Sequence, residues 1–267
     1  MDNRFKKVTP KSRVRRLIES VEGPEKTGKS HHAFTAPAPI VYFDTDYGSE
    51  GVVEKFAGDK DIYDYEVKTA KDILIKHKDT KGQGPQVDAT EEFDRFKDAY
   101  YDSLNDKTIR TVVWDTATEV WELLRLAFFG KLAQVPPMKY GPANEEYRRL
   151  VRAAFDTDKN LILLHRVKDE YVGDTNTGSM RTGKKLRAGF NDTGFLVQLN
   201  VVTYFDSPKS EDGDPEEGFG LYVRDCRQNM GIAGMRLQGK IEGIGSMCSF
   251  PYLATSVFPD TELGDWK

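Results

Sequence analysis

The sequence predicts an α/β fold in which helices flank a mainly parallel central sheet. Short, continuous apolar runs recur along the chain, for example at residues 40–43 and 160–164, and such runs are typical of strands buried on both faces. Segments with apolar residues at helical spacing separate them, for example residues 91–104. A glycine-containing phosphate-binding pattern follows the first apolar run and precedes the first expected helix. Strands that alternate with helices in this way favour parallel pairing.

The phosphate-binding pattern is G-x-x-x-x-G-K-[ST], and residues 23–30 fit it at every fixed position. Its glycines adopt backbone conformations closed to other residues, so that successive N–H groups point at phosphate oxygens. A chance match is less credible here because residues 17–21 before the pattern predict a strand and residues 29–34 after it predict a helix. The lysine would reach the β- and γ-phosphates and the serine hydroxyl would reach Mg²⁺. The predicted nucleotide-binding residues are Gly23, Pro24, Glu25, Lys26, Thr27, Gly28, Lys29, Ser30 and His31.

Composition limits the class of protein. The chain has 267 residues, of which 38% are hydrophobic, and this is enough for a substantial core. The formal net charge of -4 excludes a generally basic nucleic-acid binder, so any DNA contact must be local. Cys226 and Cys248 form neither a disulfide framework nor a zinc spacing, which favours reduced thiols. We find neither a signal peptide nor an apolar run near the roughly 20 residues that span a bilayer, and we expect a cytoplasmic protein with no membrane partner.

Acidic residues follow two of the expected strands. Asp46 comes just after the run 40–43, with Glu50 beyond it, and ligands of open α/β sheets bind at such carboxyl ends. Asp115 ends the run 111–114, which is the Walker B pattern. An aspartate after a strand is often a mere turn former, but at this spacing after a P-loop it predicts a partner of Ser30 in holding Mg²⁺. Thr116 and Glu119 have the spacing of a capping box at the start of the next helix.

His165 directly follows the expected strand 160–164. A lone histidine is more often a structural residue, but this one lies at the carboxyl end of a core strand, where it would sense the γ-phosphate of ATP. Both interpretations stay open. His31, His32 and His77 have no neighbouring acid or cysteine spacing of a metal site, so we expect structural roles for them as side chains.

Two polar segments are candidates for contact with DNA. Residues 168–191 are rich in glycine and predict a long loop, which is either a single-strand DNA loop or a mobile surface loop. Tyr171, Met180 and Phe190 would stack on bases there. Residues 1–13 form a basic N-terminal arm that either contacts a phosphate backbone or is simply solvated. The predicted DNA-binding residues of the loop are Arg181, Lys184, Lys185 and Arg187.

The last part of the chain predicts a β-hairpin followed by a short helical appendage. Residues 196–205 and 219–227 would pair as the hairpin, and a helix is expected at about residues 250–257. Arg224 and Arg227 on the second hairpin strand would reach a phosphate in the same or a neighbouring subunit, unless this is an ordinary surface strand. The expected division is therefore a basic arm at 1–13, an ATPase core at 14–240 and an appendage at 241–267.

The order of these motifs resembles a RecA-type ATPase core, and more narrowly the small RecA-like ATPases of bacteriophages, some of which act in recombination or single-strand annealing. The resemblance covers roughly residues 14–235 and is carried by residues 23–30, 43–46, 112–116 and 163–166, in that order. It implies a RecA-like P-loop NTPase core that binds ATP and Mg²⁺. It also implies a homo-oligomer as one possibility and, for a phage-encoded protein, the host cytoplasm as its location.

The same resemblance implies roles for individual residues. Asp46 takes the place of the acid that polarises the attacking water, where the family usually has glutamate, and Glu50 is a fallback. His165 takes the place of the γ-phosphate sensor, which is commonly glutamine. The loop after it takes the place of a single-strand DNA loop, and Arg224 and Arg227 that of residues reaching a neighbour's ATP.

The sequence therefore predicts a Mg-dependent ATPase that acts on DNA, in phage recombination or single-strand annealing. Two other functions stay open. One is a P-loop kinase of a small metabolite or nucleotide, with residues 178–187 as an arginine-bearing lid. The other is a nucleotide-gated interaction or assembly protein with little turnover, which the aspartate at position 46 keeps open.

Overall fold

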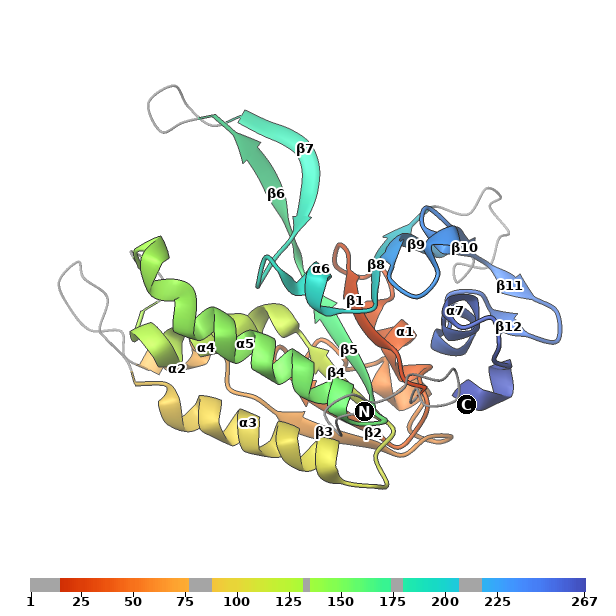
Figure 1. Ribbon diagram of the computed structural model, residues 1–267, viewed down its shortest axis with the longest axis horizontal. Coiled ribbons are helices and arrows are strands. Elements are labelled where there is room, and N and C mark those ends of the chain that lie inside the picture. Colours follow the sequence, from red (N-terminus) through yellow and green to blue (C-terminus); the bar gives the residue numbers. More distant parts are fainter. Residues whose placement is uncertain (1–14, 77–87, 132–134, 174–179, 207–217) are drawn as a thin grey trace, which may run out of the picture.

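The computed structural model describes residues 15–76, 88–131, 135–173, 180–206 and 218–267. The basic N-terminal segment 1–13 and His77 lie outside these residues. Within them, a mostly parallel sheet of eight strands forms the centre of the fold (Figure 1), which confirms the predicted fold class. In spatial order its strands are β10 (Arg236–Gln238), β9 (Phe219–Cys226), β8 (Leu199–Phe205), β1 (Ile18–Glu22), β5 (Asn160–His165), β4 (Thr111–Asp115), β2 (Ile40–Asp44) and β3 (Ile62–Glu66).

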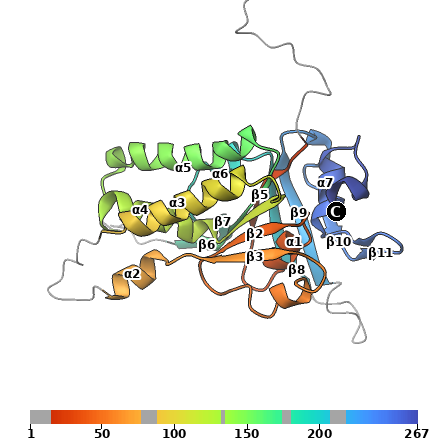
Figure 2. The ribbon, with the colours of Figure 1, turned by 90° about the horizontal axis from the view of Figure 1, so that it is seen from below.

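Helices cover both faces of the sheet (Figure 2). One face packs on the long helices α3, α4 and α5, and the other packs on α1 and α7. The strand β4 shows how alternation serves two cores: Val112 and Trp114 lie in the first and Val113 in the second. The helices are α1 (Lys29–Phe34), α2 (Ala70–Lys76), α3 (Thr90–Asn105), α4 (Ala117–Phe129), α5 (Gly141–Ala153), α6 (Thr193–Leu196) and α7 (Phe250–Val257).

Parallel pairing aligns the carboxyl ends of the central strands at one edge of the sheet. β5 lies between β1 and β4, and its His165 is in register with Glu22 while Leu164 is in register with Asp115. β8 pairs parallel with β1, and β9 then pairs antiparallel with β8 as the expected C-terminal hairpin. The loop after β1 and the residues after β2, β4 and β5 therefore share this edge.

The expected loop at residues 168–191 is largely a β-ribbon, so that prediction was wrong. β6 (Val167–Val172) and β7 (Met180–Arg187) pair antiparallel and project away from the body of the protein (Figure 1). We call this ribbon the arm. Its side chains are mostly exposed or half-buried, so neither strand carries the apolar alternation by which a strand is recognised. A second two-stranded sheet consists of β11 (Lys240–Ile241) and β12 (Gly245–Ser246).

A buried ion pair fastens α1 to both β1 and the segment before α7. His32 Nε2 lies 2.9 Å from Glu19 Oε1, and His32 Nδ1 donates to the carbonyl of Cys248 at 2.7 Å. Both side chains are almost fully buried. Burial acts to lower the pKa of His32, but the adjacent Glu19 carboxylate and the two hydrogen bonds outweigh it, and the pKa is raised. His32 is thus a structural residue that links α1 to β1 and to the segment before α7.

None of the helices that the structure describes has the length and apolar character needed to cross a membrane.

Candidate functional site

The phosphate-binding loop lies between β1 and α1, and its shape depends on a strand from far along the chain. Gly28 has φ of 86°, in the left-handed region that favours glycine. A Cβ atom on Gly23 would lie 2.1 Å from the hydroxyl of Thr203 on β8, so only glycine fits there. Thr27 Oγ1 is 2.6 Å from Thr203 Oγ1 and also donates to the Pro24 carbonyl at 2.8 Å. Thr203 therefore packs directly against the phosphate-binding loop and supports it.

Lys29 is held at the mouth of this loop. Its ammonium donates to the carbonyls of Gly23 at 3.0 Å and Pro24 at 2.6 Å. Burial lowers the pKa of Lys29, while the nearby carboxylates of Asp115 and Asp46 act in the opposite direction. A cation in a loop of backbone amides is a site for a phosphate group.

Ser30 and Asp115 meet, as their positions in the sequence predict. Ser30 Oγ donates to Asp115 Oδ2 at 2.7 Å, and the Tyr42 hydroxyl donates to the same oxygen at 3.2 Å. Burial raises the pKa of Asp115 to about 6. A hydroxyl and a carboxylate beside a phosphate loop fit Mg²⁺, which takes oxygen ligands and is usually held by one or two protein groups plus phosphates and water. Among the described residues, no set of three or more His, Cys, Asp or Glu side chains forms a metal site by itself.

The turn after β2 presents Asp46 to the same edge. Asp44 Oδ1 accepts hydrogen bonds from the backbone N–H groups of Asp46 at 3.1 Å and Tyr47 at 2.9 Å, and so shapes the turn. Asp46 Oδ1 accepts from Gly48 N at 3.1 Å. Its other oxygen faces an arginine, as described next. Glu50 lies farther along this turn with its side chain exposed.

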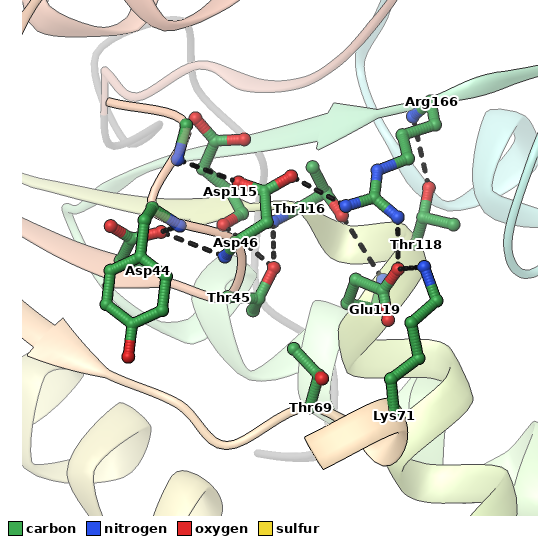
Figure 3. Close-up of polar contacts among 12 residues, drawn as sticks. Asp44, Thr45, Asp46, Thr69, Lys71, Asp115, Thr116, Thr118, Glu119 and Arg166 are labelled. Atoms are coloured by element: carbon green, nitrogen blue, oxygen red, sulfur yellow. Dashed lines mark hydrogen bonds and ion pairs between the residues drawn. The ribbon is translucent and has the colours of Figure 1, made fainter. Parts of the chain in front are cut away.

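Arg166 joins this edge of the sheet together, and the sequence reasoning did not give it a role. Its Nη2 donates to Asp46 Oδ2 at 2.7 Å, and its Nη1 bonds Glu119 Oε1 (Figure 3). Lys71 Nζ also lies 3.5 Å from Glu119 Oε1. Arg166 directly follows the strand that lies between β1 and β4, and this placement, which gives it access to both acids, is set by the pairing of the strands in the sheet.

The expected capping box at the start of α4 is only half formed. Thr116 Oγ1 accepts from Glu119 N at 3.2 Å, which is the cap. The Glu119 carboxylate does not return to the Thr116 N–H, which donates instead to Thr45 Oγ1 at 2.8 Å. Since Arg166 and Lys71 both pair with this carboxylate, charge pairing outcompetes the local capping bond.

His165 is fully buried at the end of β5. Its Nδ1 donates to the carbonyl of Ala188, just after β7, at 3.2 Å. Burial, together with the nearby Arg187 guanidinium, lowers the pKa of His165 to about 3, so the ring is neutral. Its Nε2 has no hydrogen-bond partner among the described residues. His165 therefore connects the end of β5 to the base of the arm, and its role toward the γ-phosphate stays a prediction.

His31, in the first turn of α1, packs edge-on against Phe56.

The four predicted DNA-binding cations lie in different settings. Arg181 and Lys185 both pair with Asp169 across the arm, at 2.6 Å and 2.5 Å. Lys184 is exposed between them. Arg187 lies at the base of the arm, mostly buried, where its Nη1 donates to Ser20 Oγ and Asn200 Oδ1, both at 2.9 Å.

Arg224 and Arg227 have partners within the chain. Arg224 forms an ion pair with Glu22, the last residue of β1, and its side chain is 43% exposed. Arg227 donates to the carbonyl of Phe195 at 2.5 Å. The reach of either residue to a neighbouring subunit stays a prediction.

Comparison with known proteins gives one family match and one similar solved structure. A family model described as an AAA domain matches residues 20–200, which is well over half of the chain. Among solved structures, the chain is similar to the KaiC-like protein PH0186 from the hyperthermophilic archaeon Pyrococcus horikoshii OT3, with a TM-score of 0.48, 12% identity and coverage of 86% of this chain and 87% of that one. No curated protein matches the sequence. From the extent of the family match, together with the P-loop that it contains, the chain belongs to the AAA domain family of P-loop ATPases.

Proposed function

We propose that the protein binds ATP with Mg²⁺, hydrolyses it slowly and uses the cycle to act on single-stranded DNA, in phage recombination or annealing. The observation that carries the nucleotide part is the 2.7 Å contact of Ser30 Oγ with Asp115 Oδ2 beside the Lys29 ammonium. These are the hydroxyl, the carboxylate and the cation that a P-loop ATPase needs, and they come from two different strand ends.

Each residue of this site has a defined task in the proposed reaction. Lys29 and the backbone amides of the loop bind the phosphates, and Ser30 with Asp115 would hold Mg²⁺. A Mg²⁺ ion bound there would neutralise charge that develops on the phosphate oxygens. Asp46, or failing it Glu50, orients the attacking water. Catalysis of this kind is mainly positioning and charge neutralisation, so the arrangement of carboxylates and cations decides the rate.

The pKa of Asp115 gives the proposed metal site a pH dependence. Because Mg²⁺ binds the carboxylate and not the carboxylic acid, affinity for Mg-ATP should rise as the pH increases through about 6, where Asp115 ionises. Titration of Mg-ATP from about pH 5 to about pH 8 measures this rise. Asp115→Asn should weaken binding and flatten the profile, and the exposed Asp98→Asn should leave it unchanged. A profile that Asp115→Asn does not alter would exclude this carboxylate as the titrating group.

The arm supports the DNA part of the proposal. It begins directly after His165 and Arg166, at the same edge of the sheet as the P-loop, and it projects away from the body (Figure 1). Tyr171 and Met180 are 59% and 72% exposed on it, as expected for side chains that stack on bases. Phe190, the third residue predicted to stack on bases, is buried in the core beside Trp121 and Tyr147, so that prediction was wrong. A kinase lid would have to cover the phosphates, and a ribbon that projects outward favours DNA binding over that alternative.

Measurement of ATP turnover with and without single-stranded DNA tests the proposal. Stimulation of turnover by DNA is the expected result. Phosphorylation of a small molecule would favour the kinase, and ATP binding without turnover in either condition would favour a nucleotide-gated interaction protein.

Neutralising the exposed cations of the arm should weaken DNA binding specifically. We expect the triple variant Arg181→Ala, Lys184→Ala, Lys185→Ala to lose affinity for single-stranded DNA, and the slope of log affinity against log salt to fall by about 2 units, since each phosphate contact contributes roughly 0.7. Arg187 is left intact because it is buried at the base of the arm.

The matched control removes three exposed cations elsewhere, Lys55, Lys107 and Arg152, with the same change in net charge. Fluorescence anisotropy of a labelled oligonucleotide at several salt concentrations gives both quantities. If the arm variant and the control lose equal affinity, the effect is one of net charge and the arm is not the binding surface.

A further inference from the structure

We infer that Arg166 is a switch residue. In the nucleotide-free protein it pairs with Asp46 and Glu119. When ATP binds, it breaks both ion pairs and binds oxygens of the γ-phosphate instead. This inference rests on the proposed ATP binding and adds a catalytic residue to it. Its result is that Asp46, which Arg166 occupies in the nucleotide-free protein, becomes available to orient water only when ATP is present.

The topology places Arg166 beside the expected position of a terminal phosphate. It is the first residue after β5, and β5 separates the strand that leads into the P-loop from the strand that ends in Asp115. The register puts the end of β5 level with both, since Glu22 is opposite His165 and Asp115 is opposite Leu164. A phosphate held between the P-loop and Asp115 would therefore have the start of the Arg166 segment directly beside it.

The Arg166 guanidinium and the Lys29 ammonium lie in the same group of charges. Arg166 pairs with Asp46 at 2.7 Å. Burial lowers the pKa of Lys29 and the charge of Arg166 acts in the same direction, while Asp115 and Asp46 oppose both. The two cations thus share one group of carboxylates, and a polyanion bound at Lys29 lies within the field of Arg166. Arginine suits this task because its planar fork binds two phosphate oxygens at once.

The partners of Arg166 allow the exchange without a buried charge being left unpaired. Glu119 is 96% covered, but Lys71 Nζ lies 3.5 Å from the same Oε1 and remains as a counter-charge when Arg166 leaves. Asp46 is 26% exposed and is solvated when it is released.

Only the side chain of Arg166 needs to move. Its backbone N–H donates to Thr118 Oγ1 at 3.1 Å, and its carbonyl accepts from Ala188 N at 2.8 Å, at the base of the arm. Thr118 Oγ1 in turn donates to the Ala188 carbonyl at 3.1 Å. The switch is therefore hinged at the point where both strands of the arm enter the body. Coupling between two sites is reciprocal. If ATP changes the affinity of the arm for a ligand by some factor, that ligand changes the affinity for ATP by the same factor.

The test is the ratio of affinities for a non-hydrolysable ATP analogue and ADP, measured by calorimetry with Mg²⁺ present. A switch residue acts on the γ-phosphate alone. We expect Arg166→Ala to lower the preference for the ATP analogue over ADP by about tenfold or more, with ADP affinity unchanged within about twofold, and to lower kcat at least about 100-fold. Arg166→Lys keeps the charge without the fork and should recover part of the preference.

Asp46→Asn gives a change of opposite sign. The neutral amide holds the guanidinium less strongly, so preference for the ATP analogue should rise several-fold while turnover falls. The matched control is Arg148→Ala, because Arg148 is likewise clamped by two carboxylates, Glu145 at 2.5 Å and Asp192 at 2.6 Å, but lies on α5. It should leave the ratio unchanged.

The possible results separate this inference from the proposed function. If the unmodified protein binds neither nucleotide, both are overturned. If it binds both, and Arg166→Ala weakens ATP analogue and ADP equally or not at all, then ATP binding stands and the switch is overturned. A purely structural role for Arg166 would lower the melting temperature and both affinities together, without changing their ratio.

Discussion

Lys29→Ala is expected to weaken binding of Mg-ATP at least about 100-fold, which corresponds to about 2.7 kcal/mol, and to abolish turnover. The ammonium already occupies the mouth of the loop, where it donates to the carbonyls of Gly23 and Pro24. Phosphate oxygens would replace these carbonyls as acceptors, so the cation is lost at the point where the negative charge of the nucleotide is greatest. Calorimetric titration with a non-hydrolysable ATP analogue measures the loss.

The control for this variant is Lys55→Ala, which removes one positive charge from an exposed site in the segment after β2. It should bind the nucleotide like the unmodified protein. Both variants should unfold at the same temperature as the parent, because the two hydrogen bonds of Lys29 are partly exposed and contribute little to stability. Undiminished nucleotide affinity in Lys29→Ala would exclude the loop as the phosphate site.

Glu19→Ala is expected to lower the free energy of unfolding by about 3–5 kcal/mol, which is a fall in melting temperature of roughly 6–20 °C for a domain of this size. The substitution removes the partner of His32 Nε2 at a fully buried site and leaves a cavity there, while His32 stays fixed by its second hydrogen bond to Cys248. Glu19→Gln should cost less, because the amide oxygen still accepts from Nε2. Thermal unfolding followed by circular dichroism measures both.

The same pair gives stability a predictable dependence on pH. The pKa of His32 is raised above 6.5 in the folded protein, so its contribution is fully present below pH 6.5 and is lost as the pH rises through the folded value. Glu19→Ala should remove this loss at alkaline pH. The control is Glu145→Ala, whose carboxylate is 67% exposed and pairs with Arg148 on the surface, and which should change stability by less than about 1 kcal/mol. Equal effects of the two substitutions would contradict the assignment.

The sequence predicts those parts of the fold that depend on local pattern. Strands buried on both faces are continuous apolar runs, and the carboxyl ends of parallel strands share an edge, so the meeting of Ser30 with Asp115 follows from spacing and order alone. The helix Phe250–Val257 also has the bounds that its apolar pattern predicts. The arm was missed because its strands are polar and exposed, and only their pairing with each other makes them regular.

The charge network around Arg166 was outside the reach of local reasoning for a different reason. Its partners Asp46 and Glu119 lie 120 and 47 positions away in the sequence. A carboxylate gives no local sign of which cation it will meet, and the spacing of Thr116 and Glu119 equally fits a capping box. Three-dimensional structure was needed to choose between a local hydrogen bond and a distant ion pair.

Because Thr203 supports the phosphate-binding loop, the sequence motif of the loop is shorter than the part of the chain that gives the loop its shape. Thr27 and its partner Thr203 are 176 positions apart, and the family match ends at residue 200. A fragment cut at the end of that match would keep every residue of the motif and lose the surface on which the loop rests. A fragment meant to keep the loop in this shape should therefore extend at least through β8, and the contact between His32 and Cys248 extends it to the segment that leads into α7.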